Sequence, residues 1–247
     1  MSISSVADFR YGPAESVDAA DALSKPNVTL YCIDLRRGEA VFVECDEQVE
    51  LEQYPFFYQG QYQHARRAIV LPLDVMHDLA QQRGDRFQSA VMIHSVGRCG
   101  STLLSKMFGK VAGCLSLSEP DVHTQLIAEE LPSSEIVRIL RSANRWYFQP
   151  RDESSATHLV LKFRSFCVTL AREMEQATPP AQSLFLYRDA HSVVRSGLRV
   201  FCYPKAPLWW LDQLHKWVVT RPALMIGMAW NRSIGCRLFP VLERFTS

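Results

Sequence analysis

Hydrophobic and polar residues follow two different rhythms along this chain, and the change comes near residue 88. From there on, short apolar runs alternate with longer amphipathic stretches. The apolar runs predict strands at 90–95, 114–118, 157–163 and 183–187. The amphipathic stretches predict helices at 100–111, 121–130, 133–146, 166–176, 190–201 and 208–219. Strands and helices that alternate in this way predict a parallel sheet with helices on both faces, which is an α/β fold.

The first third of the chain has another pattern. Two apolar runs around a polar turn predict a hairpin, and a helical pattern follows, so the expected elements are strands at 28–35 and 40–44 and a helix at 73–82. Residues 1–27 are polar and are expected to form loops, and residues 83–86 form a plausible linker. We expect a small N-terminal α+β portion (residues 1–87) and one α/β domain (residues 88–247). The N-terminal portion carries no catalytic motif, so it is either a structural appendage or a module that binds an acceptor or a partner.

Composition narrows the possible partners. The net charge of +1 gives no basic field, so nothing in it indicates a nucleic-acid partner. The seven cysteines show neither paired CxxC spacing nor metal-site spacing, which argues against a disulfide framework and a zinc site and suits a reducing compartment. The N-terminus lacks the basic and apolar regions of a signal peptide, and no apolar run is long enough to span a membrane. We therefore expect a cytoplasmic protein.

Residues 91–108 form the most informative segment, which reads as a strand, a glycine-bearing turn and a helix. Gly97 and Gly100 allow a sharp turn and a close approach to a ligand. The start of the helix attracts an anion through its free N–H groups and its dipole, and Arg98 adds a positive charge. These features predict a phosphate or sulfate site; a turn without a ligand is the alternative. The candidate residues are Gly97, Arg98, Cys99, Gly100, Ser101 and Thr102.

Residues 183–199 repeat the order of strand, turn and helix. Arg188 can offer a planar fork of donors to a phosphate. Ser196 follows eight positions later, about two helical turns on, where its hydroxyl can complete the clamp. Asp189 can cap the helix that starts there. The alternatives are a surface salt bridge for Arg188 and a tolerated helix position for Ser196.

The two segments together resemble those of sulfotransferases that use 3′-phosphoadenosine-5′-phosphosulfate (PAPS). In that family, a loop of the form basic-x-Gly-Ser/Thr binds the 5′-phosphosulfate, and an arginine with a serine eight positions later binds the 3′-phosphate. The resemblance implies a P-loop-type three-layer sandwich, PAPS as the sulfuryl donor, no metal, and a hydroxyl or amine acceptor. It also implies that Arg188 and Ser196 hold the 3′-phosphate, while Arg98 stabilises charge on the transferred group.

Glu119 is the candidate base that such a transfer needs. It ends the apolar run 114–118, and this segment looks like the short second strand that ends in Ser-x-Glu-Pro in many sulfotransferases. A carboxylate in a partly dry cleft can take the proton of the acceptor. The alternative is that Glu119 caps or salt-bridges the following helix. His123 is the reserve candidate, although a histidine on the helix surface is the expected identity.

Lys162 lies on a segment that resembles the strand ending Lys-Thr-His in cytosolic sulfotransferases, where the lysine lies near the sulfonate. Arg164 stands in place of the histidine and cannot act as a base at pH 7. This departure leaves Glu119 as the base and gives Lys162 and Arg164 a role in stabilising charge. The alternative for both is an exposed strand end.

The resemblance covers roughly residues 89–235, and the C-terminal segments typical of the family have no counterpart, so we expect a shortened member. The acceptor is unreadable from the sequence: a carbohydrate, a small alcohol or phenol, an amine and a protein tyrosine all fit. A catalytically inactive protein that binds a nucleotide or a partner is one alternative. A P-loop kinase is another, disfavoured because the loop lacks the Walker lysine.

Overall fold

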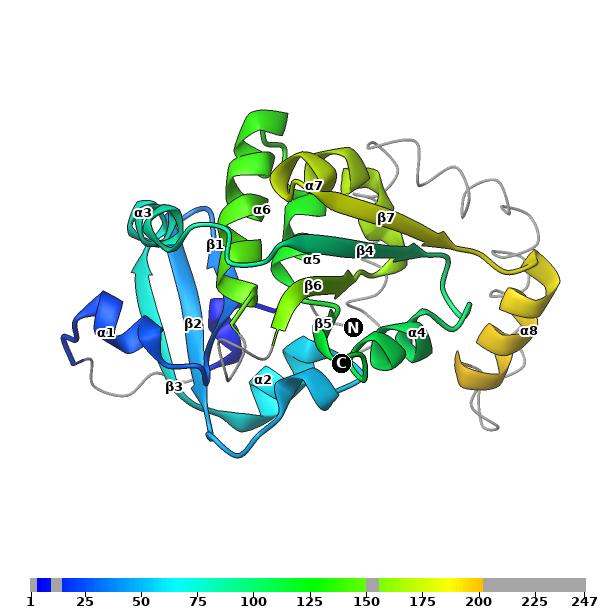
Figure 1. Ribbon diagram of the computed structural model, residues 1–247, viewed down its shortest axis with the longest axis horizontal. Coiled ribbons are helices and arrows are strands. Elements are labelled where there is room, and N and C mark those ends of the chain that lie inside the picture. Colours follow the sequence, from blue (N-terminus) through cyan, green and yellow to red (C-terminus); the bar gives the residue numbers. More distant parts are fainter. Residues whose placement is uncertain (1–3, 10–14, 150–155, 202–247) are drawn as a thin grey trace.

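The computed structural model of the protein describes residues 4–9, 15–149 and 156–201 (Figure 1). The helix expected at 208–219 lies outside the described residues, as do four of the five tryptophans.

The N-terminal portion is built on an antiparallel sheet of three strands in the order β1-β2-β3. The strands are β1 (Val28–Asp34), β2 (Glu39–Cys45) and β3 (Ala65–Pro72). The predicted hairpin is confirmed, since β1 pairs with β2 from Val28 opposite Glu44 to Asp34 opposite Glu39. β3 was not predicted; it pairs along the whole of β2 and forms an edge of the sheet.

Three helices accompany this sheet: α1 (Ala19–Ser24), α2 (Phe57–His64) and α3 (Leu73–Arg83). The helix predicted at 73–82 is α3, which ends where Gly84 adopts a positive φ of 68°. The expectation that residues 1–27 form loops is wrong for α1 and for a short 3₁₀ turn, η1 (Val6–Asp8). Both are held by side-chain caps, from Asp18 and from Ser5.

The second sheet has four parallel strands in the order β5-β6-β4-β7. They are β4 (Ser89–Ser95), β5 (Gly113–Ser118), β6 (Ala156–Lys162) and β7 (Ala181–Leu186), all close to the predicted ranges. Parallel strands of this kind are usually buried, and Leu159, Val160 and Leu161 in β6 are fully buried. The predicted parallel sheet is confirmed.

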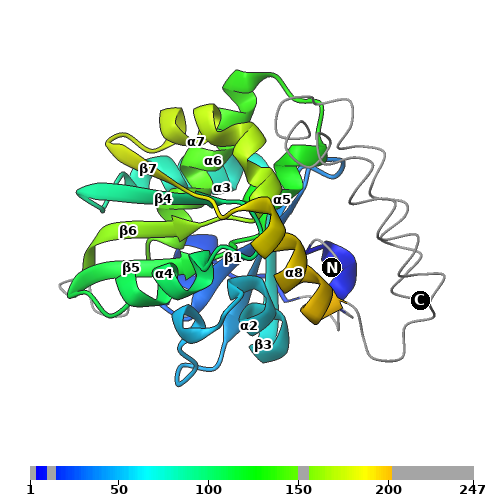
Figure 2. The same cartoon turned by 90° about the vertical axis from the view of Figure 1, so that its right-hand side faces the viewer.

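Helices cover both faces of this sheet. Figure 1 shows α4 on one side of it and α6 and α7 on the other, which is a three-layer α/β sandwich. Figure 2 looks onto the carboxyl ends of the strands, with α8 lying in front of them. The helices are α4 (Ser101–Phe108), α5 (Val122–Gln125), α6 (Ser133–Tyr147), α7 (Ala171–Ala177) and α8 (Ala190–Phe201). Two predicted helices are partly 3₁₀, because η3 (Leu126–Ala128) follows α5 and η4 (Ser165–Leu170) precedes α7.

The helix α6 joins the two sheets into one core. Its apolar face packs against β1 and α7. Trp146 of this helix lies edge-on to Phe42 of β2, with ring centroids 5.1 Å apart, and its indole N–H donates to the Met76 carbonyl at 3.2 Å. The buried apolar residues of both sheets form one continuous cluster. The described residues contain no helix long and apolar enough to cross a membrane.

Candidate functional site

The loop between β4 and α4 has the geometry of a ligand-binding turn. Gly100 adopts φ 90° and ends the turn directly before α4 begins at Ser101. A Cβ atom added at Gly97 or Gly100 meets no atom of the described residues within 4 Å, so these residues leave the backbone on this side of the loop open. No described side chain caps α4, which leaves its first N–H groups available to an anion.

Hydrogen bonds between serines hold α4 against the neighbouring strands β4 and β5. Ser95, the last residue of β4, donates a hydrogen bond from its hydroxyl to that of Ser101 at 3.1 Å. Further along, Ser105 and Ser116 bond each other at 2.9 Å and so tie α4 to β5. Ser101 is therefore buried, whereas Thr102 at the next position is half-buried and Cys99 in the loop is partly accessible.

The two predicted anion segments meet. The guanidinium Nε of Arg98 donates to the Ser196 hydroxyl at 3.1 Å, across 98 positions of sequence. Arg188 is exposed in the turn between β7 and α8, and Asp189 caps α8 by accepting from the Ser192 N–H at 2.8 Å. This bond lowers the pKa of Asp189, and the predicted cap is confirmed. Arg98, Arg188 and Ser196 thus lie at the carboxyl edge of the parallel sheet, where ligands bind in open α/β sheets.

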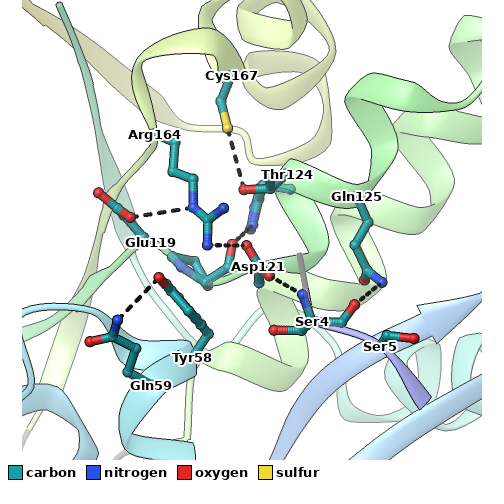
Figure 3. Close-up of polar contacts among 12 residues, drawn as sticks. Ser4, Ser5, Tyr58, Gln59, Glu119, Asp121, Thr124, Gln125, Arg164 and Cys167 are labelled. Atoms are coloured by element: carbon teal, nitrogen blue, oxygen red, sulfur yellow. Dashed lines mark hydrogen bonds and ion pairs between the residues drawn. The ribbon is translucent and has the colours of Figure 1, made fainter. Parts of the chain in front are cut away.

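Four buried charges form a network at the same edge, and Figure 3 shows three of them, Glu119, Asp121 and Arg164. Glu119 follows β5, and its carboxylate bonds Lys162 at the end of β6 and, at 3.3 Å, the Nε of Arg164. Arg164 also forms an ion pair with Asp121, with Nη2 2.9 Å from Oδ1. All four residues are at most 7% exposed. The alternative that Lys162 and Arg164 lie at an exposed strand end is therefore wrong, and Glu119 salt-bridges these two cations instead of capping a helix.

Arg98 and Glu119 each have a strained backbone conformation. Within the described residues, they are the two non-glycine positions with a positive φ, 65° and 59°. Side chains rarely adopt this region because the Cβ atom crowds the backbone. Such strain is kept where surrounding contacts hold it, frequently at functional sites.

The N-terminal portion contributes to this network, which the sequence did not indicate. The Tyr58 ring of α2 lies under the Arg164 guanidinium, 4.5 Å from it, and the Phe56 ring lies 5.9 Å from the Lys162 ammonium. The backbone N–H of Ser4 donates to Asp121 at 2.5 Å. The signal in the sequence was the run of aromatic residues Phe56, Phe57 and Tyr58 at the start of α2, but its charged partners lie about a hundred positions later.

His123 is not a surface histidine. It is fully buried, and its Nε2 lies 2.8 Å from the Asn144 amide oxygen of α6. Burial lowers its pKa to about 4. The ring packs between Tyr147 and Phe163, with centroids 5.7 and 4.9 Å away. His123 is thus part of the core and is not accessible to an acceptor as a reserve base.

Comparisons with known protein families, curated proteins and solved structures give no match to this chain. Among the described residues, no three histidine, cysteine, aspartate or glutamate side chains come together as a metal site would require.

Proposed function

We propose that this protein is a sulfotransferase with a P-loop-type fold that moves a sulfuryl group from PAPS to a hydroxyl or amine acceptor. The observation that carries the proposal is the contact between Arg98 and Ser196. It joins the two segments whose order resembles the donor-binding motifs of that family. The contact brings the two segments together at the carboxyl edge of the sheet, where one donor can reach both.

The residues at this edge suit a donor that carries two anionic ends. The open glycine backbone and the uncapped start of α4 offer N–H groups for a phosphosulfate, with Ser101 and Thr102 beside them. Arg188, which is exposed, and Ser196 offer a charged fork and a hydroxyl for the 3′-phosphate. Arg98 uses only its Nε–H on the Ser196 hydroxyl, so its other guanidinium N–H groups can stabilise charge on the sulfonate.

Glu119 can act as the base only if its partners move. Its carboxylate is engaged by Lys162 and Arg164. We propose that Lys162 turns toward the negatively charged sulfonate when donor is bound, which frees one Glu119 oxygen. Glu119 then takes the acceptor proton while the acceptor atom forms its bond to sulfur and the bond from sulfur to the phosphate oxygen breaks. Adenosine 3′,5′-bisphosphate is the leaving product.

One observation favours a second function, a nucleotide- or partner-binding protein without turnover. The charges of Glu119, Asp121, Lys162 and Arg164 already pair with one another, and Arg164 occupies the position that resembles that of the family's histidine base. The same edge then binds adenosine 3′,5′-bisphosphate, but no acceptor reacts.

A cytoplasmic location stays a prediction from cysteine usage. The described cysteines are all free thiols: Cys32, Cys45, Cys99, Cys114 and Cys167.

Calorimetry with the full chain tests the donor site. We expect adenosine 3′,5′-bisphosphate to bind, and Arg188→Ala to weaken binding at least roughly tenfold, because it removes a charge-assisted contact. Arg195→Ala removes an equal charge from the exposed side of α8 and should change the affinity less than about twofold. Equal effects of the two variants would refute the assignment of Arg188. Preference for ATP with Mg²⁺ would favour a kinase, and binding without turnover of labelled PAPS on an acceptor panel would favour the second function.

A further inference from the structure

A second cavity lies away from the anion loop, between η1, β1 and α2. Its volume is about 400 Å³. It is lined by Ser4, Asp8, Tyr31, Tyr58, Gln59, Tyr62 and Gln63. A cavity of this size accommodates a small ligand or one end of a larger one. Its lining combines three tyrosines, two glutamines and one carboxylate.

The lining of this cavity contains one acidic residue and no basic residue. Asp8 is the one acidic residue among the lining residues, and no lysine, arginine or histidine is among them. Asp8 is held in place, because one of its oxygens accepts from the Ser5 N–H at 2.8 Å and from the Tyr31 hydroxyl at 2.7 Å. Burial and this hydrogen bond raise the pKa of Tyr31 far above its ordinary value, so the phenol stays neutral. The lining therefore combines one carboxyl group with neutral polar and aromatic side chains.

Tyrosine rings line the cavity together with the Asp8 carboxylate. Tyr62 lies one helical turn after Tyr58 on α2 and is 55% exposed. Phe9 packs against both Tyr31 and Tyr62, with ring centroids 5.0 and 5.9 Å away, and helps to hold the two rings in place. The Tyr58 ring already carries Arg164, whose charge Glu119 and Asp121 balance. Tyr62 is thus the ring most available to a ligand.

We propose that this cavity binds an organic cation, an alkylammonium group, between the Tyr62 ring and the Asp8 carboxylate. A cation gains from the ring face and from the carboxylate together, whereas an anion would meet an uncompensated negative charge. A neutral ligand of the same shape gains neither electrostatic term. This inference does not depend on the proposed sulfuryl transfer, since neither Tyr62 nor Asp8 belongs to the anion loop or to the network of Glu119.

The test compares two ligands of the same shape on the full-length protein. Choline carries a trimethylammonium group, and 3,3-dimethylbutan-1-ol is its neutral counterpart with carbon in place of nitrogen. We expect choline to bind and to shift the NMR signals of the cavity, with the alcohol binding about tenfold more weakly or worse. Equal affinities for the two ligands, or no binding of choline at millimolar concentration, would overturn the proposal.

Variants locate the binding. Tyr62→Leu should weaken choline binding about three- to fivefold, while Tyr62→Phe keeps the ring and should leave the affinity nearly unchanged. Because Tyr62 is exposed, neither variant threatens the fold. Asp8→Asn should weaken binding further, whereas Asp78→Asn removes the same charge from the exposed side of α3 and should have no effect. Equal losses in Asp8→Asn and Asp78→Asn, or in the two Tyr62 variants, would contradict the site.

Discussion

Replacing Glu119 by glutamine should destabilise the protein by about 3 kcal/mol. The side chains of Glu119 and Lys162 are 8% and 5% exposed, so the variant leaves a buried ammonium without its carboxylate. Breaking a buried ion pair from one side typically costs about 3–5 kcal/mol. The lower end applies here, because Arg164 keeps its ion pair with Asp121 when Glu119 loses its charge. In a chain of this size that loss corresponds to a melting point lower by roughly 6–12 °C.

A double-mutant cycle separates this effect from any other consequence of the change. Lys162→Met removes the buried cation, so Glu119→Gln combined with Lys162→Met leaves Asp121 and Arg164 as a balanced pair. We expect the double variant to be more stable than the sum of the single losses predicts, by about 2 kcal/mol or more. Urea unfolding at pH 7 measures each free energy of unfolding.

Glu135→Gln is the matched control. Glu135 bonds Arg138 at 2.8 Å on the surface of α6, and its loss should cost less than about 1 kcal/mol. If Glu119→Gln costs no more than Glu135→Gln, or if the cycle is additive, the buried network does not support the fold as argued. Glu119 would then be held loosely enough to act as a base without any movement of Lys162.

Two further predictions concern the backbone and the pH dependence. Arg98→Gly should be more stable than Arg98→Ala by about 0.5–1 kcal/mol in urea unfolding, because glycine adopts φ 65° without strain; equal stabilities would show that the turn relaxes. Burial lowers the pKa of His123 from 6.5 to about 4, so the stability that neutral His123 allows is present above about pH 6.5 and lost as the pH falls toward 4. Between pH 7.5 and pH 4.5, His123→Gln should lose about 2 kcal/mol less than wild type, and parallel losses would contradict the assignment.

Much of the parallel sheet is readable from the sequence because burial on both faces leaves continuous apolar runs. The run that became β6 is an example, and the cap by Asp189 is another local rule that held. The strand β3 was not predicted because its first half, which contains Arg66 and Arg67, has no apolar run. Those arginines bond Asp46 and Glu44 of the neighbouring segment, so this part of the strand is held by its partner and not by its own pattern.

The environment of charged residues could not be read in the same way. Lys162 and His123 look like surface residues, since most lysines and histidines on such elements are at least partly exposed. Their burial depends on Glu119 and Asn144, which come from other elements 43 and 21 positions away. A single sequence shows the polar residues but not the pairing that makes their burial tolerable.

The buried network also explains why the two parts of the chain are difficult to separate by function. Asp121 accepts a hydrogen bond from the Ser4 N–H, and the Arg164 guanidinium packs on the Tyr58 ring. The N-terminal portion therefore contacts two of the charged residues in the network of Glu119. A ligand that draws Lys162 from Glu119 would disturb the balance on which those contacts depend. Loss of nucleotide binding on removal of residues 1–9 would therefore be an effect transmitted through Asp121 and Arg164, because Ser4 and Asp8 line the cavity beside α2 and not the anion loop.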